Sequence, residues 1–181
     1  MDTCSDGALG MAMPKAVALP EAEAWEFLER AHTGIFTTLR RSGSPLSLPV
    51  WFVALERRIY VTSPGRSAKV QRVRRDPRVC FLVEEGRSWT EVRAVVVAGT
   101  AELVEDAEER SHALVRFSEK YRGLRMPRNR ISEATRAHYG EHAALIRITP
   151  ADPIVSWDNA RVRLQQALSG DSTEAPVSAQ N

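Results

Sequence analysis

The apolar residues at the start of the chain recur at helical spacing. Trp25 and Leu28 fall on one side of the predicted helix, and the glutamates that follow Pro20 suit the positive end of a helix dipole. Proline is also favoured in the first turn of a helix. We therefore expect a helix that begins near Pro20 and ends at Gly34, because glycine commonly terminates helices.

The spacing then changes to the two-residue period of strands. In residues 46–52, leucine, valine and phenylalanine alternate with serine, proline and tryptophan, which predicts a half-buried strand. The residues 42–45 are typical of a turn, so this strand is expected to pair as a hairpin with residues 35–39. A turn at residues 56–58 leads into another predicted strand at residues 59–62.

A short helix is expected to interrupt the strands. Ser67 can cap it, and it should end before Asp76 because Pro77 disfavours helical backbone in the residue ahead of it. Strands are predicted at residues 79–83 and 89–104, with Gly99 as a bulge or a site of close backbone approach.

The last part of the pattern is a helix capped by Asp106, followed by strands at residues 144–148 and 154–157. Short antiparallel strands interrupted by helices predict a mainly β fold, a small Greek-key-like barrel with flanking helices. We expect a single domain over residues 19–166, with flexible tails at 1–18 and at 167–181, where small polar residues predominate.

The composition excludes several classes of protein. The chain has 181 residues, 43% of them hydrophobic and 27% charged, which suits one globular domain. It contains no apolar run long enough to span a membrane, and its acidic, proline-interrupted N-terminus is a poor signal peptide. Cys4 and Cys80 make neither a disulfide framework nor a metal site, so we expect a cytoplasmic protein without a bound metal.

The net charge of +2 conceals an uneven distribution of charged residues. Between Arg57 and Arg78 there are eight basic residues and one acid, Asp76. Lys69 is one of only three lysines, against 22 arginines, and helical spacing places it on one face with Arg72. A helix start that carries hydroxyls and a lysine is typical of a phosphate site.

This basic cluster has two other interpretations. It can be a solvated helix face, or it can neutralise nucleic-acid phosphates. The basic residues are confined to one loop and one helix, and no nucleic-acid-binding motif surrounds them, so we expect no nucleic-acid partner.

Several segments in order resemble the pyridoxamine 5′-phosphate oxidase-like split β-barrel superfamily, most closely its actinobacterial branch of deazaflavin- or FMN-dependent oxidoreductases. They cover most of residues 21–161 and read TTLRRSGSPLSLPVWFV, IYVTSPGRS, AKVQRVRRDPRVCFLVEE, VVVAGTAELVED and a late SWD. Such relatives often have Asn where this chain has Arg72, and Gly where it has Ala94.

The resemblance implies a homodimer with a cofactor, deazaflavin F420 or FMN, in each cleft between the subunits. It implies that the strand with Pro49, Val50 and Trp51 presents its backbone to the flavin ring, and that Trp157 lies near the ring or the subunit interface. The phosphate would be held by the loop and helix start, with Lys69 as its cation and with the further contacts Ser63, Arg66, Ser67 and Arg72.

The function implied is hydride transfer from a reduced deazaflavin to a small organic acceptor, with the cofactor supplying the difficult chemistry. Two alternatives remain, an FMN-binding flavoprotein and a non-catalytic cofactor- or haem-binding protein of the same fold. The four histidines are scattered along the chain, and the sequence identifies no catalytic residue.

Overall fold

The computed structural model describes residues 17–126, 130–133 and 143–162 of the chain. Its helices and strands are, in order, α1 (Glu21–Arg30), β1 (Thr33–Leu39), β2 (Pro45–Leu55), β3 (Arg58–Pro64), α2 (Ala68–Arg75), β4 (Arg78–Glu85), the 3-10 turn η1 (Trp89–Glu91), β5 (Arg93–Leu103), α3 (Ala107–Lys120), β6 (Ala143–Pro150) and β7 (Val155–Asp158).

Six of the strands close into an antiparallel barrel. The sheet runs β4-β1-β2-β3-β6-β5, and β5 pairs with β4 to complete the circle. β6 and then β7 follow the same edge of β5, opposite the edge that pairs with β4. The barrel is split between β2 and β3, because these strands pair only over Phe52–Leu55 of β2. The predicted mainly β, split-barrel fold is confirmed.

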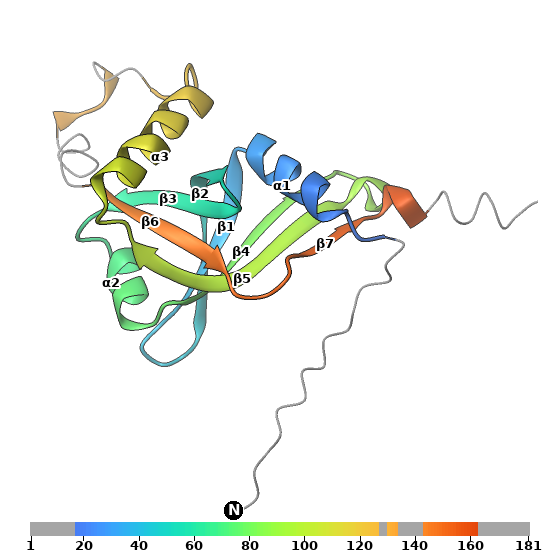
Figure 1. Ribbon diagram of the computed structural model, residues 1–181, viewed down its shortest axis with the longest axis horizontal. Coiled ribbons are helices and arrows are strands. Elements are labelled where there is room, and N and C mark those ends of the chain that lie inside the picture. Colours follow the sequence, from blue (N-terminus) through green and yellow to red (C-terminus); the bar gives the residue numbers. More distant parts are fainter. Residues whose placement is uncertain (1–16, 127–129, 134–142, 163–181) are drawn as a thin grey trace, which may run out of the picture.

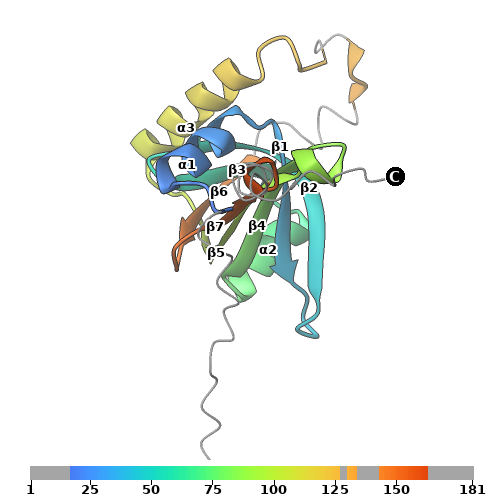
Figure 2. The same cartoon turned by 90° about the vertical axis from the view of Figure 1, so that its right-hand side faces the viewer.

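Helices cover the barrel from two sides. α1 and α3 lie together on one side, and α2 lies on the other (Figures 1 and 2). The barrel interior is filled by aromatic and branched side chains, among them Phe36, Phe52 and Phe81, which are almost inaccessible to solvent. A second apolar cluster lies under α3, where Phe117 and Tyr121 pack against the outer side of the sheet. The cluster is buried because α3 covers a sheet face that would otherwise meet water.

Gly34 differs from its predicted role. The helix α1 ends at Arg30, and Gly34 belongs to β1 instead. A Cβ atom at this position would come within 2.4 Å of the Phe81 ring, so the glycine makes room for an aromatic side chain inside the barrel. The prediction of Gly34 as a helix end was wrong. Local sequence does not show that the ring of Phe81, from β4, packs against the backbone at this position.

The predicted role of Gly99 as a site of close approach is confirmed. At this point β5 pairs with both β4 and β6, and a Cβ atom on Gly99 would lie 2.1 Å from the carbonyl oxygen of Thr149. Only a residue without a side chain lets the two backbones pack this closely.

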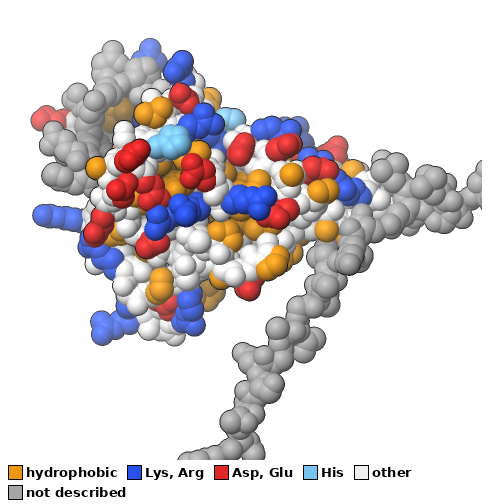
Figure 3. Space-filling model, in the orientation of Figure 1, with side chains coloured by type: hydrophobic (Ala, Val, Ile, Leu, Met, Phe, Trp, Pro, Cys, Tyr) orange, Lys and Arg blue, Asp and Glu red, His pale blue; other side chains and the backbone are white. Residues whose placement is uncertain are grey.

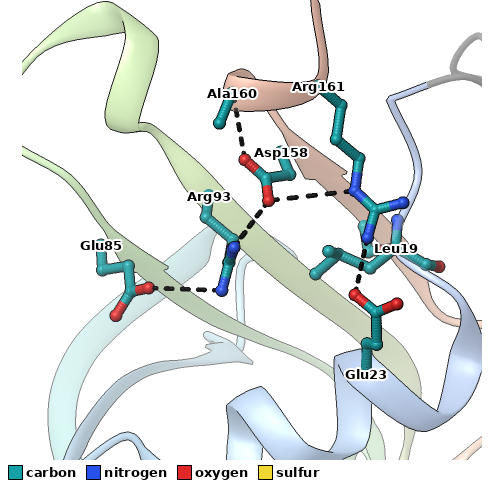
Figure 4. A network of polar contacts seen from close by, with 8 residues as sticks. Leu19, Glu23, Glu85, Arg93, Asp158, Ala160 and Arg161 are labelled. Atoms are coloured by element: carbon teal, nitrogen blue, oxygen red, sulfur yellow. Dashed lines mark hydrogen bonds and ion pairs between the residues drawn. The ribbon is translucent and has the colours of Figure 1, made fainter. Parts of the chain in front are cut away.

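An ion-pair network fixes β7 to the rest of the barrel (Figure 4). Asp158 accepts hydrogen bonds from the Nε and Nη2 atoms of Arg93, at 3.0 and 2.7 Å, and from the backbone N–H of Ala160. Arg161 lies on the other side of this carboxylate and pairs with Glu23 of α1 at 2.6 Å. The late SWD segment therefore joins β5, β7 and α1.

The surface seen in Figure 3 carries acidic and basic side chains interspersed over α1, α3 and the strands between them. Within the described residues, no helix is both long enough and apolar enough to cross a bilayer.

Candidate functional site

Two serine hydroxyls meet where β3 leads into α2. Ser63 is in β3 and is 5% exposed, and its hydroxyl lies 2.9 Å from that of Ser67. Ser67 is the N-cap of α2, as predicted, and its hydroxyl accepts a hydrogen bond from the backbone N–H of Val70. The other N–H groups of the first helical turn have no acceptor within the helix, so they point past the serines with the positive end of the helix dipole.

Lys69 stands in the first turn of α2. Its side chain is half-buried, and it forms no ion pair or hydrogen bond with any residue in the described ranges. Burial lowers the pKa of the Lys69 ammonium, and the positive charge of Arg72 lowers it further. Lys69 is therefore a cation without a counter-ion among the described residues, in the first turn of the helix that Ser67 caps.

Arg72 contacts the barrel strand β1. Its Nε donates to the Thr38 hydroxyl at 2.7 Å, and Thr38 is buried in β1. One turn further along, Arg75 donates to the carbonyl oxygen of Leu39. Burial lowers the pKa of Arg72, and the nearby charges of Arg40 and Arg75 contribute. The guanidinium groups thus hold α2 against β1, and that of Arg72 adds positive charge near Lys69.

The remainder of the basic cluster divides into paired and free residues. Arg78 makes a two-pronged contact with Asp76, and Arg57 pairs with Glu21 of α1. Arg66 and Arg74 are exposed and form no contact with another described side chain. The positive charge available to a ligand therefore comes mainly from Lys69, Arg66 and Arg74.

The strand segment that contains Pro49, Val50 and Trp51 has an open edge. It pairs with β1 on one side, and no strand among the described residues pairs with its other side. The backbone groups of Phe52 point toward the β1 side, where they bond to a tyrosine hydroxyl. Backbone groups alternate along a strand, so those of Pro49 and Trp51 point to the open edge. A proline fits there because no N–H is needed for pairing.

Tyr121 closes the gap beyond the end of the β1–β2 ladder. Its hydroxyl accepts from the N–H of Phe52 at 2.8 Å and lies 2.8 and 2.6 Å from the carbonyl oxygens of Phe52 and His32. Burial raises the pKa of the Tyr121 hydroxyl to about 12, so it remains protonated. The sequence places Tyr121 on the apolar face of a helix, and nothing in the local pattern shows that its hydroxyl completes a strand.

The Trp51 ring stacks on the Tyr121 ring, with centroids 4.3 Å apart and planes within 5°. The rest of the Trp51 side chain is accessible to solvent, since the residue is 42% exposed. The stacking fixes the direction of the Trp51 side chain at the open edge of β2. An aromatic surface with a defined orientation therefore lies beside the free backbone groups.

Trp157 is separated from these residues within one chain. It belongs to β7 and pairs with Ala94 of β5, while β4 and β1 lie between β5 and β2. The structure thus brings together Ser63, Ser67 and Lys69, and it places Trp157 on the opposite part of the sheet. The predicted position of Trp157 near a ring or an interface concerns two subunits and stays a prediction.

The chemistry of the β3–α2 donor set suits a phosphate group. Two hydroxyls and the N–H groups of a helix start supply hydrogen bonds, and the Lys69 ammonium of the same helical turn, which has no partner among the described residues, supplies positive charge. A metal site has no comparable support, because the described part of the chain holds no group of three or more His, Cys, Asp or Glu side chains that could bind one.

Comparisons with known proteins agree with the split-barrel fold. The family model described as pyridoxamine 5′-phosphate oxidase matches residues 20–152. Among solved structures, a conserved hypothetical protein of Mycobacterium tuberculosis has a TM-score of 0.71 and 24% sequence identity, over 92% of this chain and 97% of that one.

Two further solved structures are of proteins named for what they bind or store. A FAD-binding protein of Mesorhizobium loti has a TM-score of 0.57 and 20% identity, over 77% of this chain and 93% of that one. The heme storage protein of Vibrio cholerae has a TM-score of 0.58 and 18% identity, over 77% and 97%. At these identities the likeness shows a shared fold. No curated protein matches the sequence.

Proposed function

This chain belongs to the pyridoxamine 5′-phosphate oxidase family, and from that premise we propose that it is an oxidoreductase with a flavin-type cofactor. The proposed reaction is hydride transfer from a reduced deazaflavin, F420, to a small organic acceptor. The observation that carries the proposal is the Lys69 ammonium, which has no ion-pair or hydrogen-bond partner among the described residues and belongs to the first turn of the helix that Ser67 caps, a position that suits the phosphate of such a cofactor.

The residues of the β3–α2 junction, Ser63–Lys69, contribute different contacts to a bound phosphate. Ser63 and Ser67 share one hydrogen bond, so the hydroxyl that accepts in that bond is the one that donates to the phosphate, and Lys69 supplies the charge at the helix start. Arg66 is free to swing onto the phosphate from the loop. Arg72 acts at a distance, because its Nε is held by Thr38. Its charge adds to the local positive field without requiring direct contact.

The open edge of β2 is the place proposed for the ring system. The free backbone groups of Pro49 and Trp51 offer hydrogen-bonding partners to the polar edge of a flavin or deazaflavin. The cofactor supplies hydride chemistry when it is bound. The protein holds the ring at a fixed strand, whose position is secured by the Tyr121 hydroxyl on Phe52.

Deazaflavin is preferred to FMN because of the charge around α2. F420 has an acidic tail in addition to its phosphate, and the exposed Arg74 has no partner among the described side chains. FMN lacks such a tail, so only its phosphate gains from the additional charge. Arg74→Ala is therefore expected to weaken the binding of F420 by about two- to threefold through the loss of long-range attraction, and to weaken the binding of FMN less.

A homodimer is proposed on the evidence of an apolar row across five strands. Register pairs Pro49 with Ile35, Ile35 with Leu82, Leu82 with Val96, and Val96 with Val155, so all five side chains lie on the outer face of the sheet. Val155 is 49% exposed. A contiguous apolar surface of this kind marks an interaction site, and a second copy of the chain would cover it while bringing Trp157 toward the neighbouring cleft.

Titration of the purified protein with F420 and with FMN tests the cofactor assignment. Ligand fluorescence is expected to be quenched at micromolar concentrations, more strongly for F420. Lys69→Ala should reduce the affinity about tenfold or more, given about 1.5–3 kcal/mol for a hydrogen bond to a charged group. The exposed Arg122 provides a control, because Arg122→Ala removes an equal charge away from α2.

Three outcomes would contradict parts of the proposal. If neither cofactor binds, the oxidoreductase assignment fails, and binding of haem instead would favour a storage role like that of the Vibrio cholerae neighbour. Unchanged affinity in Lys69→Ala would place the phosphate elsewhere. For the homodimer, Val96→Arg is expected to convert the protein to monomers in light-scattering measurements, and a wild-type protein that is monomeric would refute it.

A further inference from the structure

The peptide that joins Trp51 to Phe52 lies at the point where β2 changes partners. The β1–β2 ladder ends at the pair of Thr33 with Trp51, and pairing with β3 begins at the pair of Phe52 with Val61. The peptide therefore stands at the closed end of the split in the barrel. It adjoins the open edge of β2, where the cofactor ring is proposed to bind.

Tyr121 holds this peptide from the side opposite to the open edge. Its hydroxyl accepts from the N–H of Phe52 at 2.8 Å and lies 2.6 Å from the carbonyl oxygen of His32, which follows the last residue of the ladder on the β1 side. The N–H of Phe52 and the C=O of Trp51 belong to one planar trans peptide, so they point in opposite directions. The Tyr121 hydroxyl thus directs the Trp51 carbonyl toward the open edge.

Tyr121 also fixes the side chain of Trp51. The two rings stack with their centroids 4.3 Å apart. Tyr121 is itself 0% exposed, forms the C-cap of α3, and packs on the ring of Phe117 at a centroid distance of 5.9 Å. One buried residue, held by α3, therefore sets the direction of both the backbone carbonyl and the indole of Trp51.

We propose that Tyr121 is a positioning residue for the cofactor ring. The role rests on the proposed function, in which the polar edge of the ring bonds to the free backbone groups of Pro49 and Trp51. Tyr121 acts through the Trp51–Phe52 peptide, because its hydroxyl lies on the other side of β2. Binding is stronger when the protein groups are already held in their binding direction, since less conformational freedom is lost. Tyr121 therefore raises the affinity for the ring, while the phosphate contacts at the β3–α2 junction do not depend on it.

Ring fragments without a phosphate test this division of roles. Riboflavin is such a fragment of FMN, and the ribityl-deazaflavin is that of F420. In Tyr121→Phe, which keeps the stacked ring, the affinity for the fragment should fall about three- to tenfold, as measured by fluorescence quenching. The ratio of the intact cofactor's affinity to the fragment's affinity measures the contribution of the phosphate. This ratio should be unchanged in Tyr121→Phe and should fall in Lys69→Ala.

Amide hydrogen exchange in the wild-type protein provides a second measurement, which does not require that Tyr121→Phe folds. The N–H of Phe52 should be protected from exchange before any ligand is added, because Tyr121 already accepts from it. The N–H of Trp51 points to the open edge and should become protected only when the ring fragment is bound. Tyr60→Phe is the matched control for the binding assays. It deletes a hydroxyl that donates to Glu109, away from the β2 backbone, and should bind the fragment as the wild type does.

The positioning role and the proposed function fail in different ways. If the wild type binds neither F420 nor FMN, the proposed function fails and the positioning role fails with it. If the intact cofactor binds, the positioning role alone is overturned by any of three results. The ring fragment binds Tyr121→Phe as tightly as the wild type, or the affinity ratio falls in Tyr121→Phe as it does in Lys69→Ala. In the third, the Phe52 amide exchanges freely in the unliganded protein, or the Trp51 amide gains no protection from the fragment.

Discussion

Removal of the Tyr121 hydroxyl provides the sharpest test of how β2 is held. Tyr121→Phe keeps the ring that stacks on Trp51 and deletes one oxygen atom. That oxygen accepts from the N–H of Phe52 at 2.8 Å and lies within hydrogen-bond distance of the carbonyl oxygens of Phe52 and His32. Both Phe52 and Tyr121 are 0% exposed, so water does not replace the lost partner without a change of structure.

The expected cost follows from the groups left without a partner. A buried N–H that loses its only acceptor costs about 1–3 kcal/mol, and the hydroxyl proton, shared between two carbonyl oxygens, contributes about one further hydrogen bond of roughly 1 kcal/mol. We therefore expect Tyr121→Phe to lower the free energy of unfolding by about 2–4 kcal/mol. Urea denaturation followed by far-UV circular dichroism measures this change without relying on Trp51 fluorescence, which the substitution itself alters.

Tyr60→Phe is the matched control. The Tyr60 hydroxyl donates to Glu109 at 2.7 Å, and Glu109 also accepts two hydrogen bonds from Arg147, so no buried backbone group is orphaned. We expect a loss of about 1 kcal/mol. A loss below about 0.5 kcal/mol in Tyr121→Phe, or equal losses in the two variants, would refute the conclusion that the Tyr121 hydroxyl acts as a substitute for a strand.

Three further predictions concern stability and use the same denaturation assay. Asp158→Ala should lower the free energy of unfolding by about 2–3 kcal/mol. This value is at the low end for a broken buried ion pair because Arg93 is about a third exposed. An unchanged free energy of unfolding would show that the network of Figure 4 does not stabilise the protein. Gly99→Ala should lower the free energy of unfolding by at least about 2 kcal/mol, since the added Cβ must displace the Thr149 carbonyl. A variant as stable as the wild type would contradict the close approach of the two backbones. For Lys120, burial lowers the pKa from 10.5 to about 8, so the unfolded chain binds more protons between these values. The free energy of unfolding should therefore rise with pH across that window, by at most about 3 kcal/mol relative to Lys120→Met, and parallel pH profiles would contradict it.

Much of the barrel follows from the sequence because strand alternation and turn residues are local signals. The hairpin of β1 and β2, the short helix capped by Ser67 and the two closing strands all lie where the pattern predicts them. Gly34 was assigned wrongly for a physical reason. A glycine after a helix and a glycine under an aromatic ring look alike in sequence, and only the position of Phe81 distinguishes them.

The candidate site was partly predictable on the same principle. Ser63, Ser67 and Lys69 are close in the chain, so a cap and a helix turn are enough to bring them together. The direction of Arg72 was not predictable, because its partner, Thr38, is 34 residues away on another strand. The direction of a long flexible side chain depends on the acceptor that tertiary packing places within its reach.

The sequence by itself determined the strand and helix pattern, the family resemblance and the dense basic cluster around α2, because each depends on neighbouring residues. Tertiary structure alone decided that Tyr121 completes β2, that the buried Lys120 ammonium has no hydrogen-bond partner among the described residues, and that five apolar side chains align into one outer row. These features join residues that are distant in the chain, and their energies arise from burial and from hydrogen bonds that exist only after the barrel has closed.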